Sequence, residues 1–247
     1  QAGFVGSSAF AHKAGLHASA IAKDPSTYEH IDPALVGNTR VIPMSNQAGQ
    51  SNLRKRLSDA GLAVAKGDPA LGRILEVVKD REAQGYAYDT AQASFELLAR
   101  DVMDQLPHLF EVERYRVTVE RRRNAEGRMV SLSEAVVVVD VDGEKRLSVS
   151  ESLDEDGADR GPVNALSKAL VKDLGKYSSL LDDMRLVDFK VRITQGGTEA
   201  TTRVIIDSED GQGRRWSTVG VSANILDASF EALLDAIRWK LIRDRAQ

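Results

Sequence analysis

The stretch Val130–Ser150, VSLSEAVVVVDVDGEKRLSVS, decides how the second half of this chain folds. It contains the run AVVVVDV at residues 135–141, whose length and composition are typical of a strand that can be buried on both faces. Asp142-Gly143 follows the run directly and is a β-hairpin turn signal, so residues 146–150 are predicted to return as the next strand. A two-stranded hairpin is marginal by itself, so further strands or a helix must pack on it.

A helix follows this hairpin, and then the whole pattern returns. From Pro162 onward the apolar residues recur with a helical period, and residues 112–119 ahead of the hairpin read as another strand. A second set of elements is predicted as strands at 184–193, 199–208 and 214–221 and a helix from Ile225. Leu166 in the first helix corresponds to Phe230 in the second at a separation of 64 residues. We therefore expect two βββα units that share one core in an α+β domain, with a pseudo-twofold relation between them.

The first 107 residues follow a helical pattern instead. Asp68 is expected to be the N-cap of one helix, because Pro69 then takes the first helical position. Further candidate caps are Ser51 or Asn52 for the helix before it and Thr90 for the helix after it. The expected division is thus a helical, loop-rich region over residues 1–107 and the α+β domain over residues 108–247.

The composition is typical of a globular protein and argues against several classes. Hydrophobic residues make up 42% of the 247 residues and charged residues 28%, with a net charge of −4. This balance does not favour a nucleic-acid platform, and the run Arg121–Arg123 is typical of a solvated strand end. No apolar run approaches the ~20 residues of a membrane span. The chain has no cysteine, which favours a reducing compartment. We expect a cytoplasmic protein without nucleic-acid or membrane partners.

The segment FAHKAGLHASAIAKDPSTY, residues 10–28, holds the candidate catalytic groups. His12 and His17 suit proton transfer at neutral pH, and Tyr28 can donate a hydrogen bond to a developing oxyanion. From the residues alone, surface or helix-capping histidines are the commoner interpretation. A zinc site built from this segment alone is disfavoured, because an i,i+5 histidine pair does not share one helical face.

Residues 8–53 carry a family resemblance, in SAFAHKAGLHASAIAKDPSTYEHIDPALVGNTRVIPMSNQAGQSNL. This segment is similar to the one that follows the catalytic barrel in the alpha-isopropylmalate synthase family, and it is most similar to the citramalate synthase branch. The rest of the chain resembles that family's C-terminal effector-binding domain. The resemblance implies that residues 1–107 are a post-barrel linker and that His17 and Tyr28 complete the active site of a neighbouring subunit. His12 matches some members of the family.

The resemblance also implies a reaction and an assembly. Such enzymes join acetyl-CoA to a 2-oxo acid in a metal-dependent Claisen condensation; pyruvate, giving citramalate, is the oxo acid expected here. The family's His-x-His metal pair does not occur in this sequence, so we expect a C-terminal fragment that is inactive alone and holds no cofactor, with a divalent metal on the missing barrel. Three alternatives stay open: a 2-isopropylmalate synthase fragment, a stand-alone amino-acid sensor or dimerisation module, and a structural oligomerisation tail.

An effector site is expected where the two predicted helices begin, at Pro162 and near Ile225. Most helix N-termini carry no ligand, although their unpaired N–H groups and the helix dipole favour a carboxylate. The resemblance places the wall of the pocket at Gly161, Leu186, Phe189, Ile193, Ala200 and Thr202. The expected effector is a branched-chain amino acid acting by feedback, isoleucine ahead of leucine, on a homodimer formed through residues 110–247.

Overall fold

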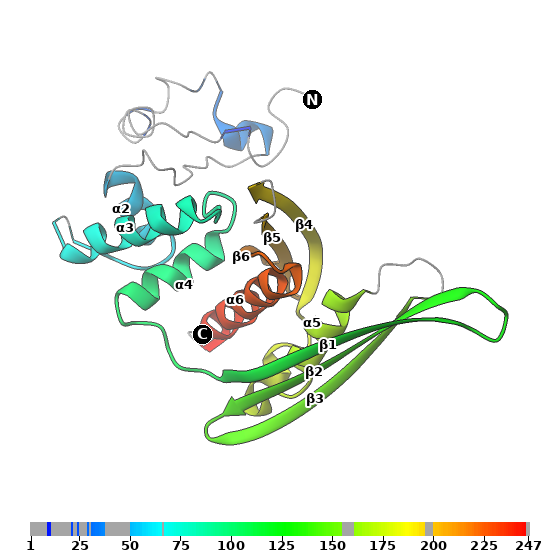
Figure 1. Ribbon diagram of the computed structural model, residues 1–247. Coiled ribbons are helices and arrows are strands. Elements are labelled where there is room, and N and C mark those ends of the chain that lie inside the picture. The colour runs from blue at the N-terminus through cyan, green and yellow to red at the C-terminus, as the bar shows by residue number, and fades with distance from the viewer. Residues whose placement is uncertain are drawn as a thin grey trace. The chain divides into compact units, whose positions relative to one another are not determined.

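The computed structural model describes residues 9–10, 21, 24, 29, 31–37, 50–65, 67–154, 161–195 and 200–245 (Figure 1). The chain divides into two compact units, Gln1–Gln105 and Leu106–Gln247. The linker and regulatory roles expected for residues 1–107 and 108–247 remain predictions.

The first unit is helical. Its described elements are the short 3-10 helix η2 (Pro33–Val36) and the helices α2 (Gln50–Asp59), α3 (Pro69–Ala83) and α4 (Gln92–Val102). Apolar side chains from the three longer helices form its core, among them Leu53, Leu57, Leu71, Ile74 and Phe95.

The start of α3 follows the local sequence signal. The Asp68 side chain accepts a hydrogen bond of 2.8 Å from the backbone N–H of Ala70, and Pro69 opens the helix, as predicted. The other two predicted caps are wrong. Helix α2 begins at Gln50, before both candidate caps, and α4 has Ala91 as its N-cap while the Thr90 hydroxyl donates back to the Ala87 carbonyl.

The second unit contains the predicted βββα pattern twice. In the first half, strands β1 (Glu111–Arg123), β2 (Met129–Val141) and β3 (Glu144–Asp154) form an antiparallel sheet and are followed by helix α5 (Pro162–Lys172). A 3-10 helix, η3 (Gly175–Leu180), then leads to the second half. There, β4 (Arg185–Gln195), β5 (Thr201–Glu209) and β6 (Arg215–Ser222) form the second antiparallel sheet, followed by helix α6 (Ile225–Arg245). The α+β prediction is confirmed.

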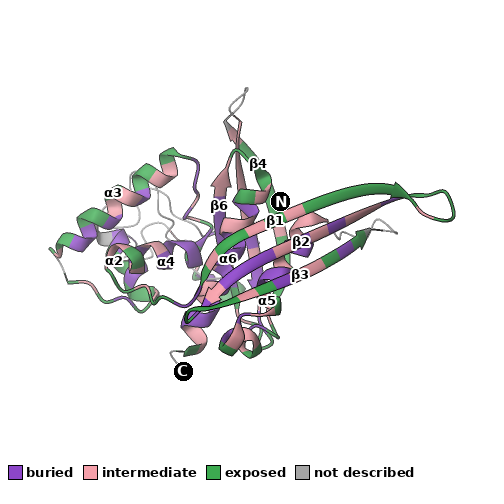
Figure 2. Ribbon diagram, turned by 60° about the horizontal axis from the view of Figure 1, so that its bottom comes forward, coloured by how far each residue is buried: buried purple, intermediate pink, exposed green. Residues whose placement is uncertain are grey.

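Each sheet has an inner face that points toward its own helix. Helix α5 packs on the first sheet, and α6 packs on β5 and β6. Buried residues, purple in Figure 2, follow β2, β6 and α6. On β2 every second side chain from Ser133 to Val141 is buried on the face toward α5, as expected of a strand with one face on a helix. Val138, on the opposite face, is buried as well.

Helix α6 lies unusually close to β6. A Cβ added to Gly220 would lie 2.0 Å from the carbonyl oxygen of Ala228, so the absence of a side chain at residue 220 allows this approach. The Thr218 hydroxyl donates to the Ala232 carbonyl at 2.7 Å, and Trp216 Nε1 donates to the Ala236 carbonyl at 3.2 Å. Three alternate residues of β6 thus contact the backbone of one helix.

The two halves of the second unit also contact each other. Tyr115 on β1 stacks on Phe230 of α6 with ring centroids 4.2 Å apart, and its hydroxyl donates to the carboxylate of Asp227. Arg238 of α6 lies over the ring of Phe110, just before β1. These contacts, together with the packing of α5 on α6, join the two halves as the repeat required. None of the helices in the described ranges is long and apolar enough to cross a membrane.

Candidate functional site

The three predicted catalytic residues, His12, His17 and Tyr28, lie outside the residues that the structure describes. Their geometry therefore plays no part in the site below. Asp32, in the same region, accepts a hydrogen bond of 3.0 Å from the Ala34 backbone N–H and caps η2. This cap gives Asp32 a structural role.

Five of the six predicted effector residues lie on or beside the first two strands of the second sheet. Leu186, Phe189 and Ile193 are on β4, Thr202 is on β5, and Ala200 directly precedes β5. Ile193 and Thr202 are paired across the two strands, and Phe189 is paired with Ile206, which is buried. Because Val204 and Ile206 face α6, these pairings put Phe189 and Ile193 on the inner face of the sheet.

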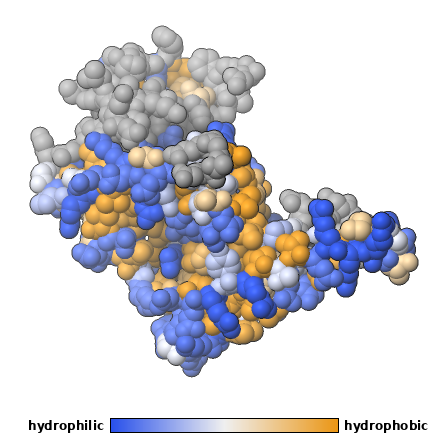
Figure 3. Space-filling view, viewed as in Figure 1, coloured by the Kyte–Doolittle hydropathy of each residue, from blue (hydrophilic) through white to orange (hydrophobic). Residues whose placement is uncertain are grey.

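The inner face of β4 is apolar and open. Helix α6 packs on β5 and β6, and Ile193 keeps 71% of its surface exposed. Leu186 and Val191 are also exposed, and apolar surface is visible in the region of β4 in Figure 3. Val191 was missed in the sequence, although it lies two residues from both Phe189 and Ile193 and strand alternation could have identified it. Leu186 lies at the far end of the strand, ~23 Å from Ile193 along the chain.

The two helix N-termini differ, although the sequence analysis expects both of them to take part in an effector site. Gly161 is the N-cap of α5 and offers no side-chain hydrogen bond, and the first turn of α5 has no acidic residue. At α6, the Asn224 side chain accepts from the Leu226 backbone N–H at 2.9 Å, and Asp227 supplies a negative charge in the first turn. An anionic ligand is therefore favoured at the start of α5 and disfavoured at the start of α6.

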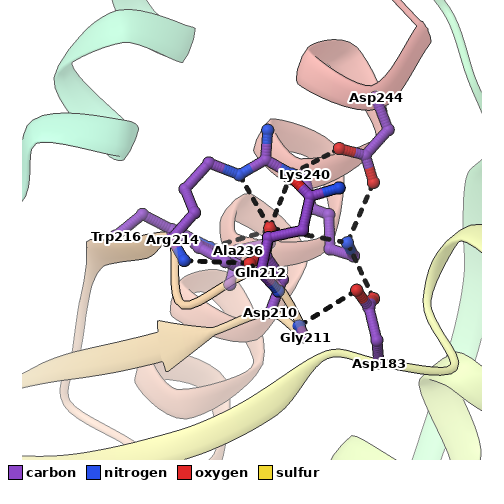
Figure 4. Close-up of polar contacts among 9 residues, drawn as sticks. All are labelled: Asp183, Asp210, Gly211, Gln212, Arg214, Trp216, Ala236, Lys240 and Asp244. Carbon is purple, nitrogen blue, oxygen red and sulfur yellow. Dashed lines mark hydrogen bonds and ion pairs between the residues drawn. The ribbon is translucent and has the colours of Figure 1, made fainter.

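A cluster of charged side chains lies at the other end of the second sheet, at the C-terminal end of α6 (Figure 4). Lys240 is only 2% exposed; its Nζ lies 2.8 Å from Asp183 Oδ1 and 2.9 Å from Asp244 Oδ2. Asp210, in the β5–β6 turn, accepts 2.8 and 2.7 Å contacts from the Arg214 guanidinium, which also binds Asp244. We call these five residues, Asp183, Asp210, Arg214, Lys240 and Asp244, the Lys240 cluster.

Hydrogen bonds and charges fix the protonation states of the Lys240 cluster. The ion pair with Lys240 is the main cause that lowers the pKa of Asp183 below its ordinary value. Burial alone would raise the pKa of Asp210, but hydrogen bonds from the backbone and side chain of Arg214 outweigh it and lower that pKa. Burial works against the charge of Lys240 too, and its bonds to Asp183 and Asp244 still raise its pKa. All three groups are therefore charged at neutral pH.

The chemistry available in these residues is binding rather than catalysis. The open face of β4 can hold an aliphatic group, and the start of α5 can hold a carboxylate. The Lys240 cluster carries an excess of one negative charge, but its members are already bonded to one another. Among the residues with described positions, no group of three or more His, Cys, Asp or Glu is arranged to hold a metal ion.

Comparison with known families fits this geometry. Residues 89–241 match the LeuA allosteric (dimerisation) domain, and residues 4–85 match the homocitrate synthase post-HMGL domain-like family. The first match covers both βββα halves. The chain belongs to the family of the LeuA allosteric (dimerisation) domain.

Among curated proteins, the chain is similar to (R)-citramalate synthases. It is 45% identical to the Synechocystis enzyme over 96% of this chain, and 41% identical to the Aquifex aeolicus enzyme over 99%. It is 30% identical to a 2-isopropylmalate synthase of Methanocaldococcus jannaschii over 94% of this chain. The chain spans 41–44% of the length of these relatives.

Proposed function

We propose that this chain is the effector-binding and dimerisation part of an acyltransferase that joins acetyl-CoA to pyruvate to give citramalate. Support comes from the family and from the identity to (R)-citramalate synthases along nearly the whole chain. The observation that carries the effector part is the apolar inner face of β4, which is open to solvent. A 2-isopropylmalate synthase is the second candidate, because a relative of that name matches over a similar length at lower identity.

The effector in this proposal is a branched-chain amino acid. Its carboxylate binds the start of α5 at Gly161, where the N-cap makes no side-chain hydrogen bond and the helix dipole favours an anion. Its aliphatic side chain lies on the inner face of β4, against Phe189 and Ile193, with Ala200 and Thr202 beside them. Leu186 forms the far end of that face. Isoleucine is the favoured effector and leucine the next, and one methylene changes affinity by only ~1–3 kcal/mol.

A homodimer through residues 110–247 completes the proposal. Helix α5 has 11 residues and is ~16 Å long, whereas β2 has 13 residues and spans ~43 Å, so α5 cannot cover the first sheet. Val119 and Met129 remain exposed at the end that α5 does not reach. A twofold partner would bury these residues together with the inner face of β4. Sedimentation of the chain at tens of micromolar should give a dimer, and a monomer would contradict this part.

The catalytic part of the proposal concerns His17 and Tyr28, with His12 as a further candidate. In the full-length enzyme they would act as acid–base and oxyanion-stabilising groups at a neighbouring barrel, where a divalent metal would hold the oxo acid. The match of residues 4–85 to a post-HMGL domain supports a position beside such a barrel. His17→Ala or Tyr28→Phe should lower turnover of the full-length enzyme by ~100-fold or more. Turnover at the wild-type rate in both variants would remove the assignment.

Calorimetry with isoleucine and leucine tests the effector site directly. Gly161→Val is a clean variant, because a Cβ at residue 161 meets no atom within 4 Å and the backbone φ is −79°. It should keep the fold while filling space beside the carboxylate site, so affinity should fall. Ile193→Ala should weaken binding by roughly tenfold, since it removes apolar contact with the ligand.

Leu147→Ala is the matched control for the β4 variant. Leu147 is 60% exposed on a strand of the same domain, and its side chain lies on the face of β3 that points away from α5. It should leave binding unchanged. Absence of heat and of a thermal shift with either amino acid at several millimolar would refute the effector proposal, and an equal effect of Leu147→Ala and Ile193→Ala would refute the placement on β4.

A further inference from the structure

Lys240 is buried among carboxylates that differ greatly in exposure. Its own side chain is 2% exposed, Asp210 is 1% exposed, and Asp244 is 17% exposed. Asp183 is 45% exposed, although its carboxylate lies 2.8 Å from the ammonium. The lysine is therefore held in place by two largely buried partners, and the bond to Asp183 is the one that water can reach and replace.

Asp183 connects three elements of the second half. It lies in the turn two residues before β4 begins at Arg185. One carboxylate oxygen binds Lys240 on α6, and the other accepts a hydrogen bond of 3.0 Å from the Gly211 backbone N–H in the β5–β6 turn. Figure 4 shows the side chain between these two partners. The start of β4 is thus fastened both to the helix and to the neighbouring hairpin.

Contacts at the start of β4 matter more for this strand than similar contacts would for β5 or β6. Within the described part of the chain it is one of the two edge strands of its sheet, β6 being the other, and it is paired only with β5. Two irregularities interrupt that pairing, between Leu186 and Asp188 and between Ile193 and Gln195. Helix α6 covers the other two strands. An edge strand with broken register and an open face is the element of this sheet that can move most easily.

We propose that Lys240 is a positioning residue that holds Asp183, and with it the first half of β4, in the position that the effector requires. The bond between Lys240 and Asp183 acts as a latch: when it is closed, the inner face of β4 is fixed relative to α6, and when water replaces it, that face is loosened. This inference rests on the proposed effector function of β4. By linkage, an effector that binds the fixed strand must in turn favour the closed latch.

Hydrogen exchange of the chain without effector tests the latch by itself. Asp183→Asn is the decisive variant, because the amide oxygen can still accept from Gly211 N–H while the ion pair with Lys240 is lost. Exchange at the amides of β4 should become about twofold to fivefold faster, the scale of a partly exposed ion pair. Lys240→Met should give a larger effect, but it also deprives Asp244 of a buried partner and can impair folding, so it is the supporting variant.

Asp173→Asn is the matched control. Asp173 makes a 3.0 Å ion pair with Arg146 between the end of α5 and β3, which is the corresponding fastening in the first half. It should leave exchange of β4 unchanged. Unchanged exchange of β4 in Asp183→Asn overturns the proposal, and so does an equal acceleration in Asp173→Asn.

Calorimetry with isoleucine then tests the link to the effector. Asp183→Asn should weaken isoleucine binding by at least about twofold. Its thermal unfolding midpoint should fall no further than that of the Asp173→Asn control. Faster exchange with unchanged affinity overturns the positioning role. If the wild-type chain binds no amino acid, the proposed function fails, and the exchange comparison still decides whether Lys240 holds β4.

Discussion

Replacing Gly220 by alanine should destabilise the second unit strongly. The new Cβ would lie 2.0 Å from the Ala228 carbonyl oxygen, whereas ordinary contact begins near 3.4 Å, so α6 must withdraw by about 1.4 Å. Withdrawal stretches the Thr218 bond to Ala232 and the bond from the Val221 N–H to Glu231, which are 2.7 and 2.9 Å long. Overpacking costs ~1–3 kcal/mol and each lost hydrogen bond ~1 kcal/mol, so the expected loss is ~3–5 kcal/mol.

Urea unfolding followed by tryptophan fluorescence measures this loss. The chain has two tryptophans, and both Trp216 and Trp239 lie in the second unit, stacked with centroids 5.2 Å apart. Gly161→Ala is the control, because its Cβ meets nothing within 4 Å, so only the loss of a favourable N-cap residue remains, which should cost ~1 kcal/mol or less. A loss of less than ~1 kcal/mol for Gly220→Ala, with an unchanged urea dependence, would show that α6 moves freely and would refute the close-packing argument.

Three further predictions concern charged and phenolic groups. Arg56 is buried with its Nε and Nη1 unbonded, and burial lowers its pKa to about 10. Arg56→Lys should therefore destabilise the first unit by ~1 kcal/mol more than Arg56→Met does, because the lysine keeps the buried charge and loses the bonds to Tyr88 and Gln92. Hydrogen exchange in α2–α4 measures the difference. Because the folded-state pKa of Asp210 lies below its ordinary value of about 4, its stabilising contribution is complete above that pH and is lost on further acidification. The urea midpoint of the wild type should consequently fall more steeply below about pH 4 than that of Asp210→Asn. Burial and the bond to Asp227 raise the pKa of Tyr115, so alkaline absorbance titration of Tyr115→Phe should lack one phenol that ionises above the ordinary tyrosine range.

The repeat and its turns could be predicted because their signals are local. The apolar run at residues 135–141, the Asp142-Gly143 turn and the Asp68-Pro69 helix start each depend on neighbours within a few residues. The wrong caps also have a local cause: Thr90 donates to Ala87 instead of capping α4, a competition that composition does not reveal. Confirmation of the fold thus reflects strong short-range patterns.

The Lys240 cluster could not be predicted, because its members come from three separate elements. Only Lys240 and Asp244, four residues apart on a helix, form a pair that a sequence can suggest. Asp210 lies in the β5–β6 turn, and its bonds to Arg214 depend on how that hairpin closes. The candidate effector residues were named by resemblance, whereas the positions of Leu186, Phe189 and Ile193 relative to β5 follow from the strand register.

The two halves of the second unit differ at both ends of their helices. Helix α5 has 11 residues and α6 has 21, so the second copy of the unit carries an extension that the first lacks. That extension holds Trp239, Lys240 and Asp244, and it fastens the turn before β4. The starts of the helices differ as well. The Asn224 side chain caps α6 and Asp227 lies in its first turn, whereas the N-cap of α5 makes no side-chain hydrogen bond. The first half thus has no side-chain cap at the start of α5, where we propose that the ligand's carboxylate binds, and the second half uses the end of α6 to hold the strand on which we place the ligand's apolar part.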